Sequence, residues 1–156
     1  MPSVKNPSKY IGYDRTATAK RPATEMLVEL CNKRWDSKCL GTLVVRKIRN
    51  KTFAGMSVHS TGRAADILIE DPVKKQQAID WFTRADVVLS LGIQELHVYD
   101  FGKWGKGWRV GRGWKDWTRL SNGGSVGAKW LHIELDYLHS SAHSFETAWR
   151  NLPKPT

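Results

Sequence analysis

The stretch GMSVHSTGRAADILIEDP, residues 55–72, predicts a turn, a strand and a helix start in direct succession. Its serine, threonine and glycine residues favour a turn around His59, and its apolar run predicts a strand over residues 64–70. The Asp-Pro pair at 71–72 is typical of an N-cap followed by the first position of a helix. We therefore expect His59 just ahead of a strand, and Asp66 at the start of that strand or just inside it.

A histidine and a carboxylate on adjoining backbone have three interpretations: metal ligands, a catalytic pair, or a hydrogen-bonded corner of the fold. The stretch AKWLHIELDY, residues 128–137, reads as a second strand. Its alternation places His132, Glu134 and Asp136 on one face and leucine and isoleucine on the other. The apolar face must cover the core, so the polar face is expected to line a cleft or meet solvent.

A histidine and a carboxylate beside one strand, with a histidine from a second strand, can supply three ligands to a metal ion. With a fourth position left for water, His59, Asp66 and His132 have the composition of a catalytic rather than a structural zinc site. The alternative is that His59 and Asp66 form a local hydrogen bond and His132 is a half-buried residue of the sheet.

Strands separated by helices, without a regular strand–helix–strand repeat, predict an α+β domain with a small, mostly antiparallel sheet flanked by helices. Val73, Ile79 and Phe82 are expected on the buried side of the helix that begins at Pro72. No linker interrupts residues 1–156, so we expect a single domain. The other expected segments are strands at 42–48, 93–101 and 128–137 and helices at 23–35 and 141–150.

The composition is that of a globular protein with a basic surface. Apolar residues make up 40% and charged residues 26% of the 156 residues, and the formal net charge is +10. The apolar runs are far shorter than the roughly 20 residues that span a bilayer. Residues 1–22, a basic N-terminal arm, lack the apolar stretch of a secretory signal. We expect a protein made in the cytoplasm that binds a polyanion: nucleic acid, an anionic membrane or a bacterial wall.

Residues 102–127 are expected to form a long loop or a wide hairpin rich in glycine and tryptophan. They contain eight glycines and four of the eight tryptophans, interleaved with lysine and arginine. These tryptophans can fold back as a small core, stack on the sugars of a glycan strand, or stack on the bases of single-stranded nucleic acid. Trp104 and Trp108 are the candidates for glycan contact.

Residues 57–66, SVHSTGRAAD, resemble the pattern Ser-x-His-x-x-x-Gly-x-Ala-x-Asp, loosely read, of a superfamily of zinc peptidases. That superfamily is grouped around lysostaphin, the D-alanyl-D-alanine carboxypeptidases and dipeptidases, and the Sonic hedgehog domain. KWLHIEL, residues 129–135, is similar to its second motif, in which a C-terminal strand carries the last zinc histidine after an aromatic residue. The matching positions are Ser57, His59, Gly62, Ala64 or Ala65, Asp66, Trp130 and His132.

The resemblance implies one zinc ion per chain, held by His59, Asp66 and His132, in a hedgehog- or D-Ala-D-Ala-peptidase-like fold. It also implies hydrolysis of a peptide bond in peptidoglycan, by a carboxypeptidase or endopeptidase such as a bacteriophage endolysin that reaches the cell wall after release. The expected state is a monomer that binds peptidoglycan and its anionic polymers, without a membrane span. The alternatives are a catalytically inactive zinc-binding module of the same fold and a basic nucleic-acid-binding protein.

The general base is where this sequence departs from its relatives. Many members carry a glutamate three residues before the last zinc histidine, but here that position is Lys129, whose ammonium has no lone pair. Other branches carry His-x-Asp or His-x-His at this strand instead. Glu134, on the same strand face as His132, is therefore the first candidate for the base, and His97 is the second, as base or oxyanion donor.

Members of the superfamily hold a substrate carboxylate with an arginine upstream of the first motif. Arg46 and Arg49 are the candidates in this chain. Ser57 and Arg63, inside the first motif, are further candidates for substrate contact.

Overall fold

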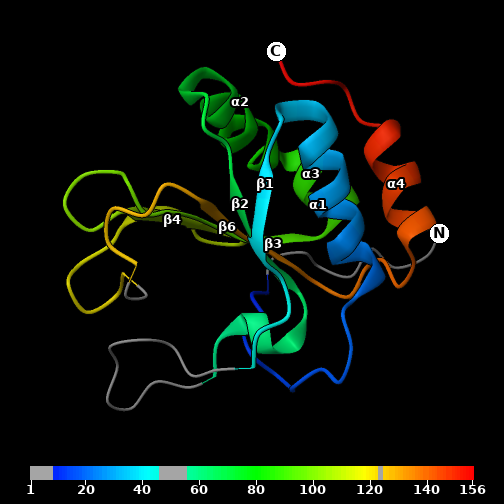
Figure 1. Cartoon of the computed structure of the whole chain (residues 1–156), viewed down its shortest axis with the longest axis horizontal. Helices are drawn as coiled ribbons and strands as arrows, with labels where there is room; N and C mark the ends of the chain where they lie inside the picture. Colours follow the sequence, from blue (N-terminus) through cyan, green and yellow to red (C-terminus); the bar gives the residue numbers. More distant parts are fainter. Residues whose placement is uncertain (1–8, 46–55, 123–124) are drawn as a thin grey trace.

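The computed structural model describes residues 9–45, 56–122 and 125–156 (Figure 1). Within these ranges the chain has an α+β fold with one six-stranded antiparallel sheet and four α-helices. The helices are α1 (Pro22–Trp35), α2 (Pro72–Phe82), α3 (Ala85–Leu91) and α4 (Ala142–Arg150), with a short 3-10 helix η1 (Val58–Thr61). The strands are β1 (Lys38–Gly41), β2 (Ala64–Leu68), β3 (Ile93–Val98), β4 (Lys106–Arg109), β5 (Gly113–Asp116) and β6 (Leu131–Leu135).

The last of these strands in the sequence lies in the middle of the sheet. The strand order is β1-β2-β6-β3-β4-β5, so β6 pairs with β2 on one side and with β3 on the other. His132 in β6 is thereby the direct neighbour of Asp66 in β2 and of His97 in β3. Side chains opposite each other in such pairs lie about 4.5–5.5 Å apart at Cβ. The topology thus gathers residues from distant parts of the sequence on one face.

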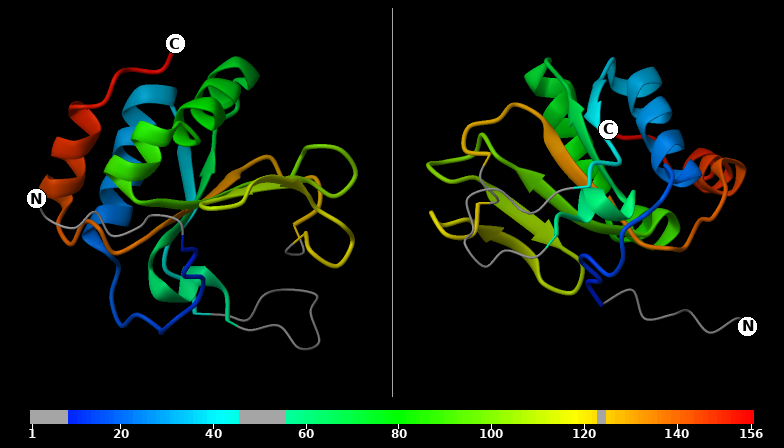
Figure 2. Two further views of the ribbon diagram at one scale, coloured as in Figure 1. Left: turned by 180° about the vertical axis from the view of Figure 1, so that it is seen from behind. Right: turned by 60° about the horizontal axis from the view of Figure 1, so that its bottom comes forward.

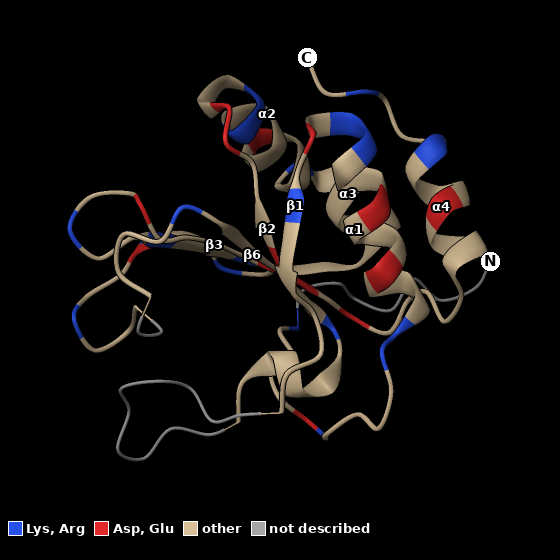
Figure 3. Cartoon of the chain, in the orientation of Figure 1, with Lys and Arg blue, Asp and Glu red and all other residues tan. Residues whose placement is uncertain are grey.

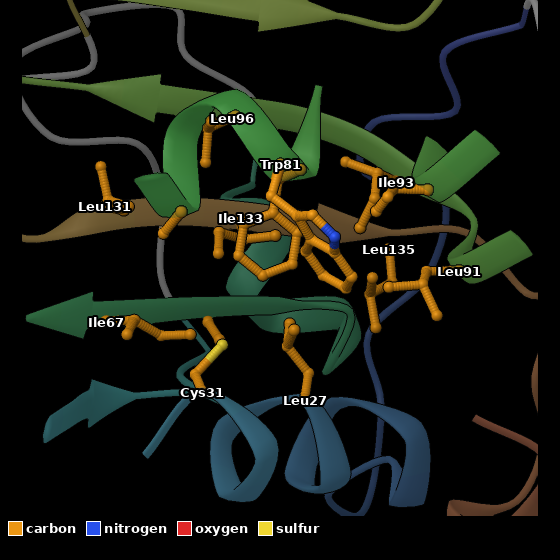
Figure 4. Close-up of a cluster of buried hydrophobic side chains, with 14 of the residues drawn as sticks. Leu27, Cys31, Ile67, Trp81, Leu91, Ile93, Leu96, Leu131, Ile133 and Leu135 are labelled. Carbon is orange, nitrogen blue, oxygen red and sulfur yellow. The ribbon is translucent and has the colours of Figure 1, made fainter. Parts of the chain in front are cut away.

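The helices pack on one face of the sheet and form the core with it (Figure 2). Leu131, Ile133 and Leu135 of β6 contribute to this core together with Leu27 of α1 and Trp81 of α2 (Figure 4). All five side chains are at most 2% exposed. The alternation of β6 therefore directs its apolar residues to the helices, as the sequence predicts.

The other face of the sheet is polar and also buried. His132 and Glu134 alternate with the core residues of β6, yet they are only 8% and 3% exposed. The N-terminal arm helps to cover them: the Tyr10 hydroxyl donates to Glu134, and the backbone N–H of Ala17 donates to the carbonyl of Ser60 in η1. The polar face does not meet solvent at these two positions, because coil segments pack over it.

The strand predicted at residues 42–48 is wrong over residues 42–45, and residues 46–48 lie outside the described residues; the structure places β1 earlier, at Lys38–Gly41. Cys39 of β1 pairs with Ile67 of β2, and residues 42–45 continue from the strand without regular structure. The β-branched residues after position 42 indicated a strand, but the pairing partner on β2 selects the segment that directly follows α1.

The prediction for the buried side of α2 is confirmed for Ile79 and Phe82 and wrong for Val73, which is 77% exposed. The covered stripe of the helix runs through Lys75 and Ala78 to Ile79 and Phe82. Val73 lies two positions before this stripe begins, which turns it about 200° away around the helix.

Two glycines in the loop between β3 and β4 give a test of the backbone packing. Gly102 and Gly105 both have a positive φ, of 57° and 85°. A Cβ on Gly105 would lie 2.7 Å from the carbonyl oxygen of Val98, whereas a Cβ on Gly102 would have nothing within 4 Å.

We predict that Gly105→Ala lowers the free energy of unfolding by about 1–3 kcal/mol more than Gly102→Ala does. Both variants bear the strain of a left-handed alanine, about 1–2 kcal/mol, and only Gly105→Ala adds the overpacking against β3. Urea denaturation of both variants and the parent measures the difference. Equal destabilisation by the two substitutions would contradict the packing at Gly105.

Candidate metal centre

Three side chains converge at the point where η1, β2 and β6 meet. His59 Nε2 lies 3.1 Å from Asp66 Oδ2, His132 Nδ1 lies 3.1 Å from Asp66 Oδ1, and the two nitrogens lie 3.2 Å apart. His59 is 3% exposed and His132 is 8% exposed. The two ring nitrogens lie next to each other, and each faces a different oxygen of Asp66; this group is positioned to bind a metal ion.

The local sequence holds His59 in place. Ser57 is the N-cap of η1, and its hydroxyl accepts a hydrogen bond from the backbone N–H of His59. Gly62 ends η1 in the left-handed conformation, with a φ of 72°, and this turns the chain into β2. The turn and strand that the motif predicts therefore fix the direction from which His59 approaches Asp66.

On the side of each ring that faces away from the cluster, a hydrogen bond decides which ring nitrogen carries the proton. His59 Nδ1 lies 2.8 Å from the carbonyl oxygen of Thr42. A carbonyl oxygen can only accept, so we assign the proton to Nδ1. The neutral ring then directs the lone pair of Nε2 at Asp66 and His132.

The same argument holds for the second ring, turned the other way. His132 Nε2 lies 2.9 Å from Glu134 Oε1, so this nitrogen donates to the carboxylate. The Nδ1 lone pair of His132 then faces His59 and Asp66. Two imidazole lone pairs and one carboxylate therefore point at a common centre, an arrangement that requires a positive charge there.

The electrostatics agree with that requirement. Burial acts to raise the pKa of Asp66, but its contacts with the His132 and His59 rings outweigh this and hold that pKa well below its usual value. Burial also disfavours a charged His132, yet Asp66 and Glu134 raise its pKa to about 10. Without a metal ion, the cluster thus retains a proton on His132 to supply the missing positive charge.

The distances between the ligand atoms of neighbouring residues in the cluster fit a small divalent metal ion. Zinc bonds of about 2.0–2.1 Å place neighbouring ligand atoms of a tetrahedral site about 3.3 Å apart. The observed separations of 3.1–3.2 Å are close to this value. Three protein ligands leave the fourth position of such a site open.

A second layer of polar side chains supports His132. Glu134 Oε1 accepts from His132 and Glu134 Oε2 accepts from the Tyr10 hydroxyl, 2.8 Å away. Burial acts to raise the pKa of Glu134, but the hydrogen bond with His132 holds that pKa below its usual value. Both oxygens of this carboxylate have partners, which favours a positioning role over the general-base role expected from the sequence.

Glu95 of β3 lies directly across from Glu134 and is 4% exposed. Burial, and then the charge of Glu134, raise the pKa of Glu95. Arg109 of β4 forms an ion pair with Glu95, and its guanidinium lies 4.2 Å from the centre of the Tyr10 ring. The positive charge of Arg109 thus compensates the negative charge of Glu95, the second carboxylate of this layer.

His97, the other candidate catalytic residue, forms a wall beside the cluster. Its ring stacks on Tyr99 at 4.1 Å and lies 5.0 Å from the ring of Trp117. His97 Nε2 is buried without a hydrogen-bond partner in the described part of the chain. Burial, and the charges of His132 and Arg109, lower the pKa of His97 to about 2, so its ring is neutral.

The structure places several expected contact residues away from the cluster. Arg63 is 0% exposed and donates to the carbonyls of Leu135 and Gly12, so a substrate cannot reach it. Trp108 pairs with Leu96 and packs against the core, on the face of the sheet away from the ligands. Trp104 is half-buried in the β3–β4 loop.

Four further positions complete the comparison with the sequence. Lys129, at the place of the missing glutamate, is 76% exposed and lies 3.8 Å from Asp100. Asp136 follows β6 and donates its backbone N–H to the Gly92 carbonyl, away from the ligands. Arg46 and Arg49 lie outside the described residues.

Sequence reasoning missed the supporting residues Tyr10, Thr42, Glu95 and Arg109. The alternation of IQELHV could have placed Glu95 on the same face as His97. Tyr10 has no such signal, because its partner is 124 positions away in the sequence.

Comparisons with family models, with curated proteins and with solved structures found no match for this chain. Among the described residues, no helix is both long and apolar enough to cross a membrane.

We predict that His59→Ala and Asp66→Ala each weaken the binding of a divalent metal by at least about 100-fold, the upper end of what loss of an outer-shell partner costs. His139→Ala is the matched control, because that histidine bonds to Ser90 and Ser144 between α3 and α4. Cobalt absorption and metal content after dialysis measure the binding. Full occupancy in a His59→Ala, Asp66→Ala double variant would rule out this site.

Proposed function

We propose that the chain is a zinc-dependent hydrolase that cleaves a peptide bond in bacterial peptidoglycan. The observation that carries the proposal is the convergence of His59 Nε2, the Asp66 carboxylate and His132 Nδ1, at separations of 3.1–3.2 Å. Three protein ligands and one open position are the arrangement of catalytic zinc sites, whereas structural sites use four protein ligands.

The donor set favours zinc among the common metals. Two imidazole nitrogens and one carboxylate suit zinc, while calcium and magnesium prefer oxygen ligands alone. The two free cysteines, Cys31 and Cys39, lie outside the cluster. When bound, zinc lowers the pKa of a coordinated water towards 7 and polarises a carbonyl group.

The residues around the ligands have separable roles in this proposal. Glu134 fixes the tautomer and the orientation of His132 by accepting its Nε2 proton. His97 is a neutral imidazole next to His132, and its buried Nε2 has no hydrogen-bond partner among the described residues. It can therefore donate a hydrogen bond to the oxygen on which charge develops when a substrate enters the cluster. Tyr99 and Trp117 restrict the His97 ring to this position.

Peptidoglycan is the substrate suggested by the motif around the ligands. The spacing of Ser57, His59 and Asp66, followed by His132 on a later strand, resembles the zinc peptidases that act on wall peptides, and the α+β fold is compatible with their hedgehog-like architecture. Lysine and arginine residues occur on helices, on loops and on β1 (Figure 3), and the net charge of +10 favours association with an anionic wall. An endolysin that reaches the wall after release from the cytoplasm fits these properties.

A non-catalytic metal-binding module is the second candidate. It is favoured by the two engaged oxygens of Glu134 and by Lys129, which extends towards solvent and Asp100 rather than to the ligands. Nucleic-acid binding has less support, since Trp108 packs on the core and Trp117 covers Gly107 on the sheet.

The direct experiment is digestion of purified peptidoglycan by the zinc-loaded protein, followed by mass spectrometry of the released fragments. Peptide-bond cleavage is expected to release one new amino group and one new carboxyl group per event, without new reducing sugar ends. Asp66→Asn provides the inactive control. A protein that holds zinc and leaves peptidoglycan from several wall types intact would instead be the non-catalytic module.

We predict that Glu134→Gln and His97→Gln separate the two roles. His97→Gln is expected to keep the metal affinity of the parent and to lower kcat by about 100-fold or more. Glu134→Gln is expected to weaken metal binding by about 10-fold or more, because the amide is a poorer acceptor for His132. If Glu134→Gln instead retains full metal affinity and loses about 100-fold in kcat, Glu134 is the general base.

A further inference from the structure

We propose that residues 9–17 of the N-terminal arm are part of the metal centre, with Tyr10 as a positioning residue for the ligand His132. This inference rests on the metal site of the proposed function. Docking of these arm residues and binding of the metal then stabilise each other.

Tyr10 completes the hydrogen bonding of the carboxylate that orients His132. Glu134 has one oxygen on His132 Nε2, at 2.9 Å, and the other on the Tyr10 hydroxyl, at 2.8 Å. Glu134 is 3% exposed, so water cannot readily replace the phenol as a donor. A buried carboxylate that loses a donor becomes costly to keep ionised and less firmly placed.

The Tyr10 ring also stabilises the neighbouring charges. Glu95 and Glu134 face each other across β3 and β6, and such like-charge pairs are unfavourable unless each carboxylate has its own donor. Arg109 forms an ion pair with Glu95 and lies over the Tyr10 ring, while the Tyr10 hydroxyl donates a hydrogen bond to Glu134. Tyr10 thus directs the arginine to one carboxylate and its own hydroxyl to the other.

The arm is attached to both segments that supply the imidazole ligands. Ala17 donates its backbone N–H to Ser60, the neighbour of His59 in η1, at 2.8 Å. Tyr10 binds the β6 side, and between these points Ile11 donates its backbone N–H to the Gln94 side chain at 2.8 Å. The arm passes beside η1 (Figure 2). It therefore bridges the two parts of the chain that must stay together for the ligands to converge.

Mutual stabilisation follows from linkage. If a docked arm holds His132 in the geometry that binds the metal, then a bound metal must favour the docked arm by the same factor. Loss of an outer-shell partner of a metal ligand costs about 10–100-fold in affinity, and Tyr10 acts one hydrogen bond further out.

The test compares Tyr10→Phe with Tyr13→Phe in the full chain. Both variants remove one phenolic hydroxyl from the arm, but within the described part of the chain the Tyr13 hydroxyl pairs only with Thr16 at the surface. Zinc affinity is measured by competition with a chelator. We expect Tyr10→Phe to weaken zinc binding by about 10-fold and Tyr13→Phe to leave it within about twofold of the parent. Equal zinc affinity in both variants would overturn the inference and leave the proposed function intact.

A second measurement needs no variant. Hydrogen exchange of residues 9–17 in the parent is expected to slow when zinc is added, as linkage requires. Unchanged exchange in a protein that does bind zinc would overturn the coupling alone. A parent that binds no zinc would overturn both this inference and the proposed function.

Discussion

The hydrogen bonds behind the two histidines are the constraint on which the rest of the site depends. The Thr42 carbonyl fixes the tautomer of His59, and the Glu134 carboxylate fixes that of His132. Each bond turns a lone pair inward, where Asp66 already carries a negative charge. Such a group is unstable without a cation or a proton at its centre, so these outer contacts position the cluster to bind a metal ion.

The sheet topology makes this arrangement possible. With β6 between β2 and β3, one strand face presents Asp66, His132 and His97 in a row, and the next row contains Glu134 and Glu95. The opposite face holds the apolar core under the helices, so the polar face is left to the coil segments. Because these segments bury it, each carboxylate on it requires a donor, and the arm and β4 provide them.

The members of the His59–Asp66–His132 cluster could be predicted from the sequence because their signals are local. His59 and Asp66 lie in one turn and strand, and the alternation of β6 places His132 on the face away from the core. The position of Tyr10 could not be predicted, since its arm has no periodicity and its partner is 124 positions away. The role of Glu134 needed the structure as well: alternation gives its face, but only its burial and its two partners separate an orienting carboxylate from a free base.

Local sequence patterns do not decide how segments pair and pack, as the missing strand at residues 42–45 and the exposed Val73 show. Composition indicated a strand after position 42, whereas pairing with β2 selected Lys38–Gly41. That displacement has a consequence for the site, because Thr42 directly follows β1 and offers its carbonyl to His59. The register of an edge strand therefore contributes to the tautomer of His59.

The most direct measurement is a crystal structure of the zinc-loaded protein with anomalous data at the zinc edge. The account predicts one zinc ion at about 2.0–2.2 Å from His59 Nε2, an Asp66 oxygen and His132 Nδ1, with Glu134 still accepting from His132 Nε2. Zinc bound through His132 Nε2, or zinc located away from these three side chains, would contradict it.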